Sequence, residues 1–411
     1  MKAVCFAATL PRYLLTKAAG GLAWSLLLGP HACTRLADLP EPALPDGSWV
    51  RIRTRLGGIC GSDLATVTLR ASPATSPFAS FPFVPGHESV GEIAELGADV
   101  RGFSRGERVT VNPLLACAAR RVDPPCPECA AGRPQRCQRF TDGALPPGML
   151  TGTTRSLGGS WGESFVAHES QLVRVPAALS DEEAVLIEPL ACSVHAVRGA
   201  PPRSGERVLV VGAGSIGLLT LAALRELSPE SEITIVARHA FQGEHAARLG
   251  AAWVVRGAND QALAEAAGAR LLGTLIGPPV AVGGFDRAFV CVGGRRGTET
   301  ALRFTRAGGT VALLGNVAAL GGLDWTPLWL KELTLRGSVC YGGNGAPARL
   351  ARGSGAAGAG DFGQAVAIAL ARRDALRPLV THAFPIREYR RAIGTALDRR
   401  GSKSVKVVFR F

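Results

Sequence analysis

One segment of the chain limits the possible folds more than any other, because it combines an apolar strand, a glycine turn and a helix. Residues 206–227 read ERVLVVGAGSIGLLTLAALREL. The strand shows no alternation of polar and apolar residues, which is typical of a strand buried on both faces of a parallel sheet. Similar apolar strands are predicted in EITIVARH, FDRAFVCVGG and GGTVALLGN, with helical stretches between them. This succession of apolar strands and helices along the chain predicts an α/β fold with a doubly wound parallel sheet.

The glycine turn of this segment predicts a nucleotide site. Gly212 permits a tight turn, Gly214 lets a pyrophosphate approach the backbone, and Gly217 allows close packing of the helix. The helix N-terminus adds a positive dipole that favours phosphate. Because the motif lies between a strand and a helix, we predict that it binds a dinucleotide, with Ser215 and Ile216 completing the turn.

The end of the next strand bears on the choice between NAD and NADP. An NAD site would carry Asp or Glu here to bind the ribose 2′-hydroxyl, whereas this chain has Ala237 and Arg238. A guanidinium can bind a 2′-phosphate through two hydrogen bonds, and no carboxylate repels that phosphate. The pair favours NADP over NAD. In the alternative, Arg238 is a surface arginine and the site accepts either cofactor.

The first half of the chain has a different pattern. WVRIRTRL (Trp49–Leu56) alternates apolar and basic residues, as a half-buried strand does. Glycine and proline then interrupt the chain up to Pro147, which predicts an irregular β-rich domain. Near the other end, the Gly- and Ala-rich segment from Gly342 to Gly360 predicts a flexible connection, and the final SVKVVFRF predicts a strand.

Charge and hydropathy exclude several classes of protein. The net charge is +13, but arginine supplies all except five of the 46 basic residues and is scattered among Ala and Gly, so we do not expect nucleic-acid binding. The apolar run Gly21–Gly29 is too short to cross a membrane, and no secretory signal is evident. A cytoplasmic location is expected. In that reducing compartment, clustered cysteines favour metal binding or redox chemistry over disulfides.

Two turns in the first half carry candidate metal ligands. GICGSD places Cys60 just after the Trp49 strand, and PGHES places His87 beside Glu88. A thiolate, an imidazole and a carboxylate from separate loops form the kind of shell that leaves a position on zinc open for water or substrate. Each residue considered alone would be interpreted as an ordinary buried residue.

Together with the glycine turn, these motifs resemble a known family. The chain is similar to the zinc-dependent medium-chain dehydrogenases, and most similar to the branch of polyol (sorbitol-like) and threonine dehydrogenases. The matching segments follow one another over nearly the whole chain: MKAV, GICGSDL, PGHESVGEI, GERVTVNP, IEPLACSVHA, VGAGSIG, GGTVALLG and SVKVVF.

The resemblance implies roles for particular residues. It makes Cys60 and His87 ligands of a catalytic zinc, and Glu88 is similar to an acid that binds zinc in the polyol branch. Glu188 occupies a position that supplies either a direct ligand or an acid holding the water on the metal. Ser62 corresponds to the hydroxyl that relays the alcohol proton.

The resemblance also implies supporting groups and shows where the chain departs from the family. Asp63 matches the acid that orients the histidine ligand, as metal-bound imidazoles usually require. Some relatives continue the proton relay with a histidine where this chain has Ala65, so water or another group must complete it. The segment before Trp49 and the stretch Thr66–Phe83 match the family least, and such loops tend to shape the substrate pocket.

For the whole chain, the resemblance implies a zinc-dependent oxidoreductase that transfers a hydride between a secondary alcohol or polyol and a nicotinamide cofactor. It implies a GroES-like catalytic domain over 1–197, a Rossmann domain over 198–345 and a return to the catalytic domain over 346–411. It also suggests a homodimer or homotetramer. Zinc polarises the substrate oxygen so that an alkoxide can form near neutral pH.

Three other functions are alternatives to this one. A biosynthetic enzyme that acts on a sugar or an aminocyclitol would use the same zinc chemistry. A zinc-stabilised binding protein would have little reason to retain the whole set of candidate catalytic residues. A zinc-free quinone reductase would lack both the cysteines and the metal ligands.

The segment CAARRVDPPCPECAAGRPQRC holds four of the ten cysteines. In the resembling family, a lobe spaced C-x2-C-x2-C-x7-C binds a structural zinc, and Cys126, Cys129 and Cys137 match its last three members. Asp123 stands where the first cysteine is expected. Either Cys117 completes the site across the insertion, or Asp123 supplies a carboxylate, or the lobe, at about residues 113–140, has lost its metal. We favour Cys117, because coordination requires four ligands in space and no particular loop length.

A redox role for Cys126 and Cys129 is the remaining alternative for this segment. We disfavour it because we expect no helix of a thioredoxin-like unit to begin at the pair.

Overall fold

A computed structural model describes residues 1–257, 259–315, 319–343 and 360–411. The chain forms two compact units: the first unit comprises Met1–Glu188 and Tyr341–Phe411, and the second unit comprises Pro189–Cys340. The domain limits predicted from the sequence, at residues 197 and 345, fall nine and five residues beyond the junctions at Glu188 and Cys340. Most of the predicted Gly- and Ala-rich connection, residues 344–359, lies outside the described part of the chain.

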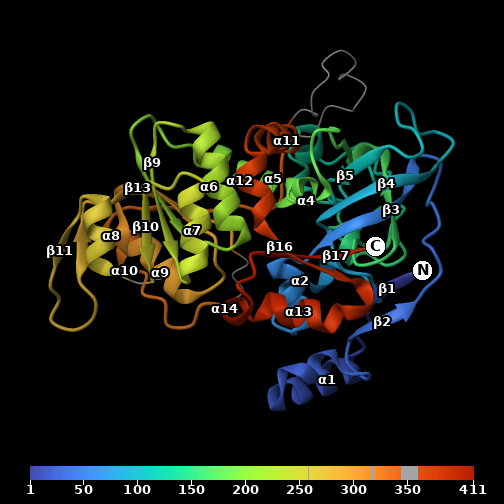
Figure 1. The fold of residues 1–411 in the computed structure, drawn as a ribbon, viewed down its shortest axis with the longest axis horizontal. Coiled ribbons are helices and arrows are strands. Elements are labelled where there is room, and N and C mark those ends of the chain that lie inside the picture. The colour runs from blue at the N-terminus through green and yellow to red at the C-terminus, as the bar shows by residue number, and fades with distance from the viewer. Residues whose placement is uncertain (258, 316–318, 344–359) are drawn as a thin grey trace. The chain divides into compact units, whose positions relative to one another are not determined.

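The second unit is built on a six-stranded, wholly parallel sheet (Figure 1). In spatial order its strands are β10 (Trp253–Arg256), β9 (Glu232–Ala237), β8 (Arg207–Val211), β13 (Phe285–Val290), β14 (Thr305–Leu313) and β15 (Thr334–Gly337). Its helices are α6 (Ser215–Leu227), α7 (Ala240–Arg248), α8 (Asp260–Ala267), α9 (Arg295–Phe304) and α10 (Thr326–Leu330). A separate hairpin pairs β11 (Arg270–Leu272) with β12 (Val280–Val282).

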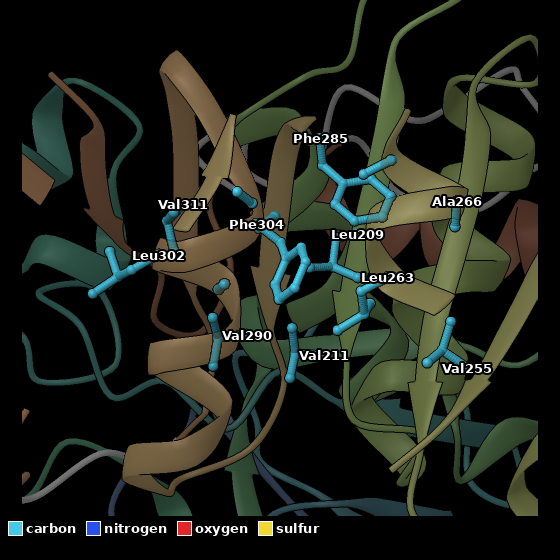
Figure 2. Packing of buried hydrophobic residues seen from close by; sticks show 14 of the residues in the cluster. Leu209, Val211, Val255, Leu263, Ala266, Phe285, Val290, Leu302, Phe304 and Val311 are labelled. Carbon is cyan, nitrogen blue, oxygen red and sulfur yellow. The ribbon is translucent and has the colours of Figure 1, made fainter. Parts of the chain in front are cut away.

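The apolar residues of these strands form the core of the second unit. Figure 2 shows Leu209 and Val211 of β8, Phe285 and Val290 of β13, and Phe304 of α9 within one buried cluster. None of these five side chains is more than 4% exposed. Strands buried on both faces leave no position for alternating polar residues, which explains the continuous apolar runs in the sequence. The predicted doubly wound sheet is confirmed.

The strand order reverses between β8 and β13, the two central strands of the sheet. In open α/β sheets, ligands bind outside the carboxyl ends of the strands at such a reversal. The glycine turn that begins at Gly212 follows β8 at this point.

The first unit contains a seven-stranded, mostly antiparallel sheet in the order β16-β17-β3-β4-β5-β7, with β6 paired to β3, and a small sheet of β1 and β2. Its strands are β1 (Lys2–Phe6), β2 (Thr34–Asp38), β3 (Trp49–Gly58), β4 (Ser89–Leu96), β5 (Arg108–Val111), β6 (Ser164–His168), β7 (Leu172–Arg174), β16 (Val380–Pro385) and β17 (Lys406–Arg410). The strand predicted at Trp49 and the C-terminal strand are both present.

Short helices connect these strands. They are α1 (Leu10–Leu22), α2 (Gly61–Val67), α3 (Pro127–Ala130), α4 (Asp181–Ala184), α11 (Asp361–Ala371), α12 (Arg373–Leu376), α13 (Tyr389–Leu397) and α14 (Arg399–Ser402), and α5 (Ile187–Gly199) crosses the junction into the second unit. Short 3₁₀ helices are η1 (Trp24–Leu28), η2 (Pro73–Phe78), η3 (Pro134–Arg136), η4 (Thr151–Thr153), η5 (Glu169–Gln171), η7 (Arg377–Leu379) and η8 (Ile386–Glu388). No helix in the described ranges is long and apolar enough to cross a membrane.

The two segments that match the family least pack against each other. Leu27 and Cys33 of the N-terminal segment lie in one buried cluster with Leu69 and Phe83. The N-terminal segment therefore packs against both ends of the stretch Thr66–Phe83.

Candidate metal centres and nucleotide-binding turn

The pairing of β3 with β4 brings the first set of candidate ligands together. Cys60 follows the end of β3 and caps α2, whereas His87 and Glu88 immediately precede β4. The strands are antiparallel, and the Gly58 N–H donates to the Glu88 carbonyl at 2.9 Å. The donor atoms of Cys60, His87 and Glu88 consequently all lie within 4.8 Å of one another. We call these three residues the Cys60 cluster.

Gly58 is required beside this cluster. A Cβ at this position would collide with Oε2 of Glu88. The backbone of β3 therefore approaches the carboxylate closely, which only glycine permits.

Asp63 connects two members of the cluster. One carboxylate oxygen accepts a hydrogen bond from the Cys60 N–H at 2.9 Å, and the other lies 3.5 Å from Nδ1 of His87. Holding Nδ1 leaves Nε2 of His87 as the atom that can bind a metal. Burial alone would lower the pKa of His87, but Asp63 and Cys60 together raise that pKa well above its ordinary value.

Lys406 is a member of this site that sequence reasoning missed. Its Nζ lies 2.6 Å from each carboxylate oxygen of Glu88, and the two side chains are only 3% and 1% exposed. Burial alone would lower the pKa of Lys406, but Glu88 and Cys60 outweigh this effect and raise it. A lysine in the apolar strand β17, in a chain with only five lysines, was the available signal.

Glu188 lies outside the group whose donor atoms are mutually within 4.8 Å. Its carboxylate accepts a hydrogen bond of 2.5 Å from the Tyr341 hydroxyl, and both residues are buried. Burial raises the pKa of Glu188 to about 7, although the positive charge of His87 opposes the rise. Tyr341 is a second residue that the sequence did not reveal.

The donors of the Cys60 cluster fit zinc. A thiolate, an imidazole and a carboxylate are all ligands that zinc takes in catalytic sites, and three protein ligands leave a fourth position for substrate. Ser62 lies half-buried in the first turn of α2, two residues after Cys60, and Ala65 follows one turn later.

The second candidate metal centre consists of the four cysteines of the interrupted motif. Cys117, Cys126, Cys129 and Cys137 have sulfur atoms within 4.8 Å of one another, and we call them the four-cysteine cluster. The Cys117 and Cys137 sulfurs are 3.6 Å apart. Asp123 is exposed and does not belong to the cluster. Four converging thiols fit a closed tetrahedral zinc site.

Backbone amides point at these sulfurs. The Cys126 N–H lies 3.4 Å from the sulfur of Cys117, and the Gln138 N–H lies 3.5 Å from the sulfur of Cys126. Burial opposes ionisation of Cys126, but donors that include the Gln138 N–H lower its pKa to about 6. Burial raises the pKa of Cys137 to about 11.

Cys126 caps the one-turn helix α3, which is not the long helix of a thioredoxin-like unit that the redox alternative would need. A helix of four residues has little dipole to offer, and the sulfur of Cys126 also lies 3.9 Å from that of Cys137. The arrangement is that of four thiols around a common centre, and no isolated Cys-x-x-Cys pair is formed.

The nucleotide turn has the geometry that its glycines predict. Gly212 has φ of +101°, and a Cβ on Gly217 would collide with the carbonyl of Gly212. Helix α6 begins at Ser215 with Gly214 as its cap, so the amides of Ser215, Ile216 and Gly217 lie in its first turn. This is the backbone arrangement that receives a pyrophosphate.

At the end of β9, Ala237 is buried and Arg238 is exposed. Arg238 makes no ion pair with a carboxylate in the described part of the chain. Its guanidinium is therefore not held by a carboxylate of the described residues.

Comparison with known proteins gives consistent matches. Residues 46–177 match the model of the alcohol dehydrogenase GroES-like domain, and residues 215–352 match that of the zinc-binding dehydrogenases. The chain is 30% identical to L-idonate 5-dehydrogenase of Vitis vinifera, over 88% of this chain and 87% of that protein. It is 28% identical to sorbitol dehydrogenase of Arabidopsis thaliana, over 88% of each chain. The crystal structure of galactitol-1-phosphate dehydrogenase from Escherichia coli is similar over all of both chains, with a TM-score of 0.73 and 21% identity.

Proposed function

The chain belongs to the zinc-dependent medium-chain alcohol dehydrogenase family, and on that premise we propose that it oxidises a secondary alcohol of a polyol-like substrate, or reduces the corresponding carbonyl, with Cys60, His87 and an acid holding the metal. The observation that supports this proposal most strongly is the Cys60 cluster, whose three chemically different donors converge within 4.8 Å. Zinc bound there would act as a Lewis acid on the substrate oxygen.

The residues of the chain supply the rest of the chemistry. Asp63 fixes the ring of His87 so that Nε2 faces the metal position. Glu88 provides a carboxylate whose charge Lys406 balances. Ser62 is the group that accepts the alcohol proton and passes it on, and Glu188, with a pKa near 7, can hold a proton at neutral pH.

For the cofactor, we propose NADP, with its pyrophosphate on the turn Gly212–Gly217 and its 2′-phosphate on Arg238. The exposed, unpaired guanidinium and the absence of an acid at Ala237 support this choice. Comparison of the Michaelis constants for NADP and NAD tests it, and a strong preference for NAD would contradict it.

For the four-cysteine cluster, we propose a structural zinc with Cys117 as the fourth ligand. The burial of Cys117, Cys126 and Cys137 and the exposure of Asp123 support this assignment. Replacing Cys117 with Ser should reduce the zinc content by one ion per chain, whereas replacing Asp123 with Asn should leave it unchanged. The reverse result would assign the ligand to Asp123.

The substrate class can be tested directly. Zinc-replete enzyme should be assayed with simple secondary alcohols, polyols and aminocyclitols, with formation of the reduced cofactor as the readout. The names of the relatives, which refer to L-idonate and sorbitol, favour polyols. Turnover of aminocyclitols alone would establish the biosynthetic alternative. No turnover of any alcohol or carbonyl would favour a binding protein. Cytoplasmic location and assembly into a homodimer or homotetramer remain predictions.

A further inference from the structure

Arg120 is a fully buried cation in the insertion that separates Cys117 from the rest of the cysteine motif. Its side chain is 0% exposed. Burying a cation is costly unless hydrogen bonds and a compensating negative charge surround it. The groups that accept its hydrogen bonds and balance its charge therefore have to be identified.

Backbone carbonyls meet the hydrogen-bonding needs of the guanidinium. Nε donates to Leu115 at 2.9 Å. The two terminal nitrogens donate to four carbonyls of one further segment: Asp142 at 2.8 Å, Leu145 at 3.2 Å, Pro146 at 2.8 Å and Gly148 at 2.6 Å. All five bonds go to neutral acceptors, so they satisfy the donors and leave the charge uncompensated.

A carboxylate does not supply the missing charge. Within the described ranges, Arg120 forms no ion pair. The side chain of Asp142 points instead to Arg139, at 2.7 Å, on the protein surface. The negative charge has to come from another group close to residue 120.

The four-cysteine cluster is the group that can provide it. Cys117 precedes Arg120 by three residues, and the Cys117 carbonyl accepts the Val122 N–H at 3.0 Å in the same turn. Four thiolates around one divalent zinc carry a net charge of about −2. With zinc bound, the excess negative charge of the four thiolates would compensate the positive charge of Arg120, and Arg120 would compensate theirs.

We propose that Arg120 is the positioning residue of the four-cysteine metal site, in which its charge balances the thiolates and its hydrogen bonds hold the displaced Cys117 in place. The inference rests on the proposed structural zinc. This role explains how the chain can keep a four-cysteine site although its first cysteine is displaced to Cys117. The insertion that displaces Cys117 also carries Arg120, whose positive charge balances the thiolates. Its hydrogen bonds to carbonyls within residues 142–148 also connect the segment that carries the four cysteines to the segment that follows it.

The rate of zinc release tests this role. Holoenzyme would be mixed with a chromophoric zinc chelator, and the release of zinc would be followed over time. The kinetic phase that is absent from Cys126→Ser would be assigned to zinc in the four-cysteine cluster. Arg120→Met should release this zinc at least tenfold faster than the wild type. Arg120→Lys, which keeps the charge but cannot make all five bonds, should fall between the two. Arg121→Met is the matched control, because Arg121 is adjacent and its side chain is 62% exposed.

A second readout separates this role from a general loss of stability. If Arg120 balances the thiolates, its replacement should lower the melting temperature more in zinc-loaded protein than in protein stripped of zinc. If Arg120→Met does not fold, the same comparison is made with Arg120→Lys. Release at the wild-type rate, or equal destabilisation with and without zinc, would overturn the role of Arg120. A wild-type protein with one zinc per chain would overturn the four-cysteine site itself.

Discussion

In protein stripped of metal, replacing Lys406 with Met should destabilise the first unit strongly, because it leaves the buried Glu88 carboxylate without its counter-charge. Lys406 and Glu88 are 3% and 1% exposed, and Nζ lies 2.6 Å from both oxygens of Glu88. Removal of one partner from a buried ion pair typically costs about 3–5 kcal/mol. Met fills most of the volume of the lysine stem, so a packing defect contributes little to this figure.

Urea denaturation followed by tryptophan fluorescence is a suitable assay. Trp49 and Trp161 are both 0% exposed and belong to the first unit, and the ring of Trp161 packs edge-on against Phe409 of β17 at 5.2 Å. The tryptophans of the second unit, Trp253, Trp325 and Trp329, are already 39%, 46% and 67% exposed, so the change in emission on unfolding reports mainly the unit that contains the pair. With a slope of about 3 kcal/mol per molar urea, the midpoint should fall by about 1 M or more.

Two further variants separate loss of the buried ion pair from a general effect of replacing a lysine. Lys403→Met is the matched control, because Lys403 is an exposed lysine three residues away. The double variant Glu88→Gln with Lys406→Met removes both charges and should recover most of the lost stability. If Lys406→Met unfolds at the same urea concentration as Lys403→Met, the buried pair does not stabilise the unit and this reasoning fails.

Three other predictions concern the metal and cofactor sites. Gly58→Ala should reduce kcat/KM at least tenfold, because the new Cβ displaces the Glu88 carboxylate, and steady-state kinetics at wild-type levels would refute this. In protein stripped of metal, Glu188 keeps its proton up to about pH 7 when folded but loses it near its ordinary pKa of 4.5 when unfolded. Stability should therefore fall by about 2–3 kcal/mol as the pH rises from 4.5 to 7, and Glu188→Gln should remove this slope in pH-dependent melting. Arg238→Glu should raise the KM for NADP at least tenfold with little change for NAD, and an unchanged KM would remove Arg238 from the site.

Much of the fold could be predicted because its signals are local. The run of apolar residues in β8, the alternation in β3 and the glycines at 212–217 each depend on neighbours within a few positions. The two turns that carry the candidate metal ligands were equally visible, because a cysteine after one strand and a His-Glu pair before the next are short motifs.

The missed residues depend on contacts that no local pattern reveals. Lys406 reaches Glu88 across 318 positions of the chain, and Tyr341 reaches Glu188 across 153. Arg120 looked like one scattered arginine among many, because its role comes from carbonyls as far away as Gly148. The helix at Cys126 was missed because a single turn has no periodicity to detect.

The most direct test of the account is the zinc content of Cys60→Ala, measured beside the wild type and related to turnover in the same preparations. We predict two zinc ions per chain in the active wild type, and one ion with no turnover in the variant. Two results would contradict the assignment of the catalytic metal to Cys60, His87 and their neighbouring acids. In one, Cys60→Ala keeps two zinc ions per chain and its activity. In the other, Cys60→Ala is active with a single ion.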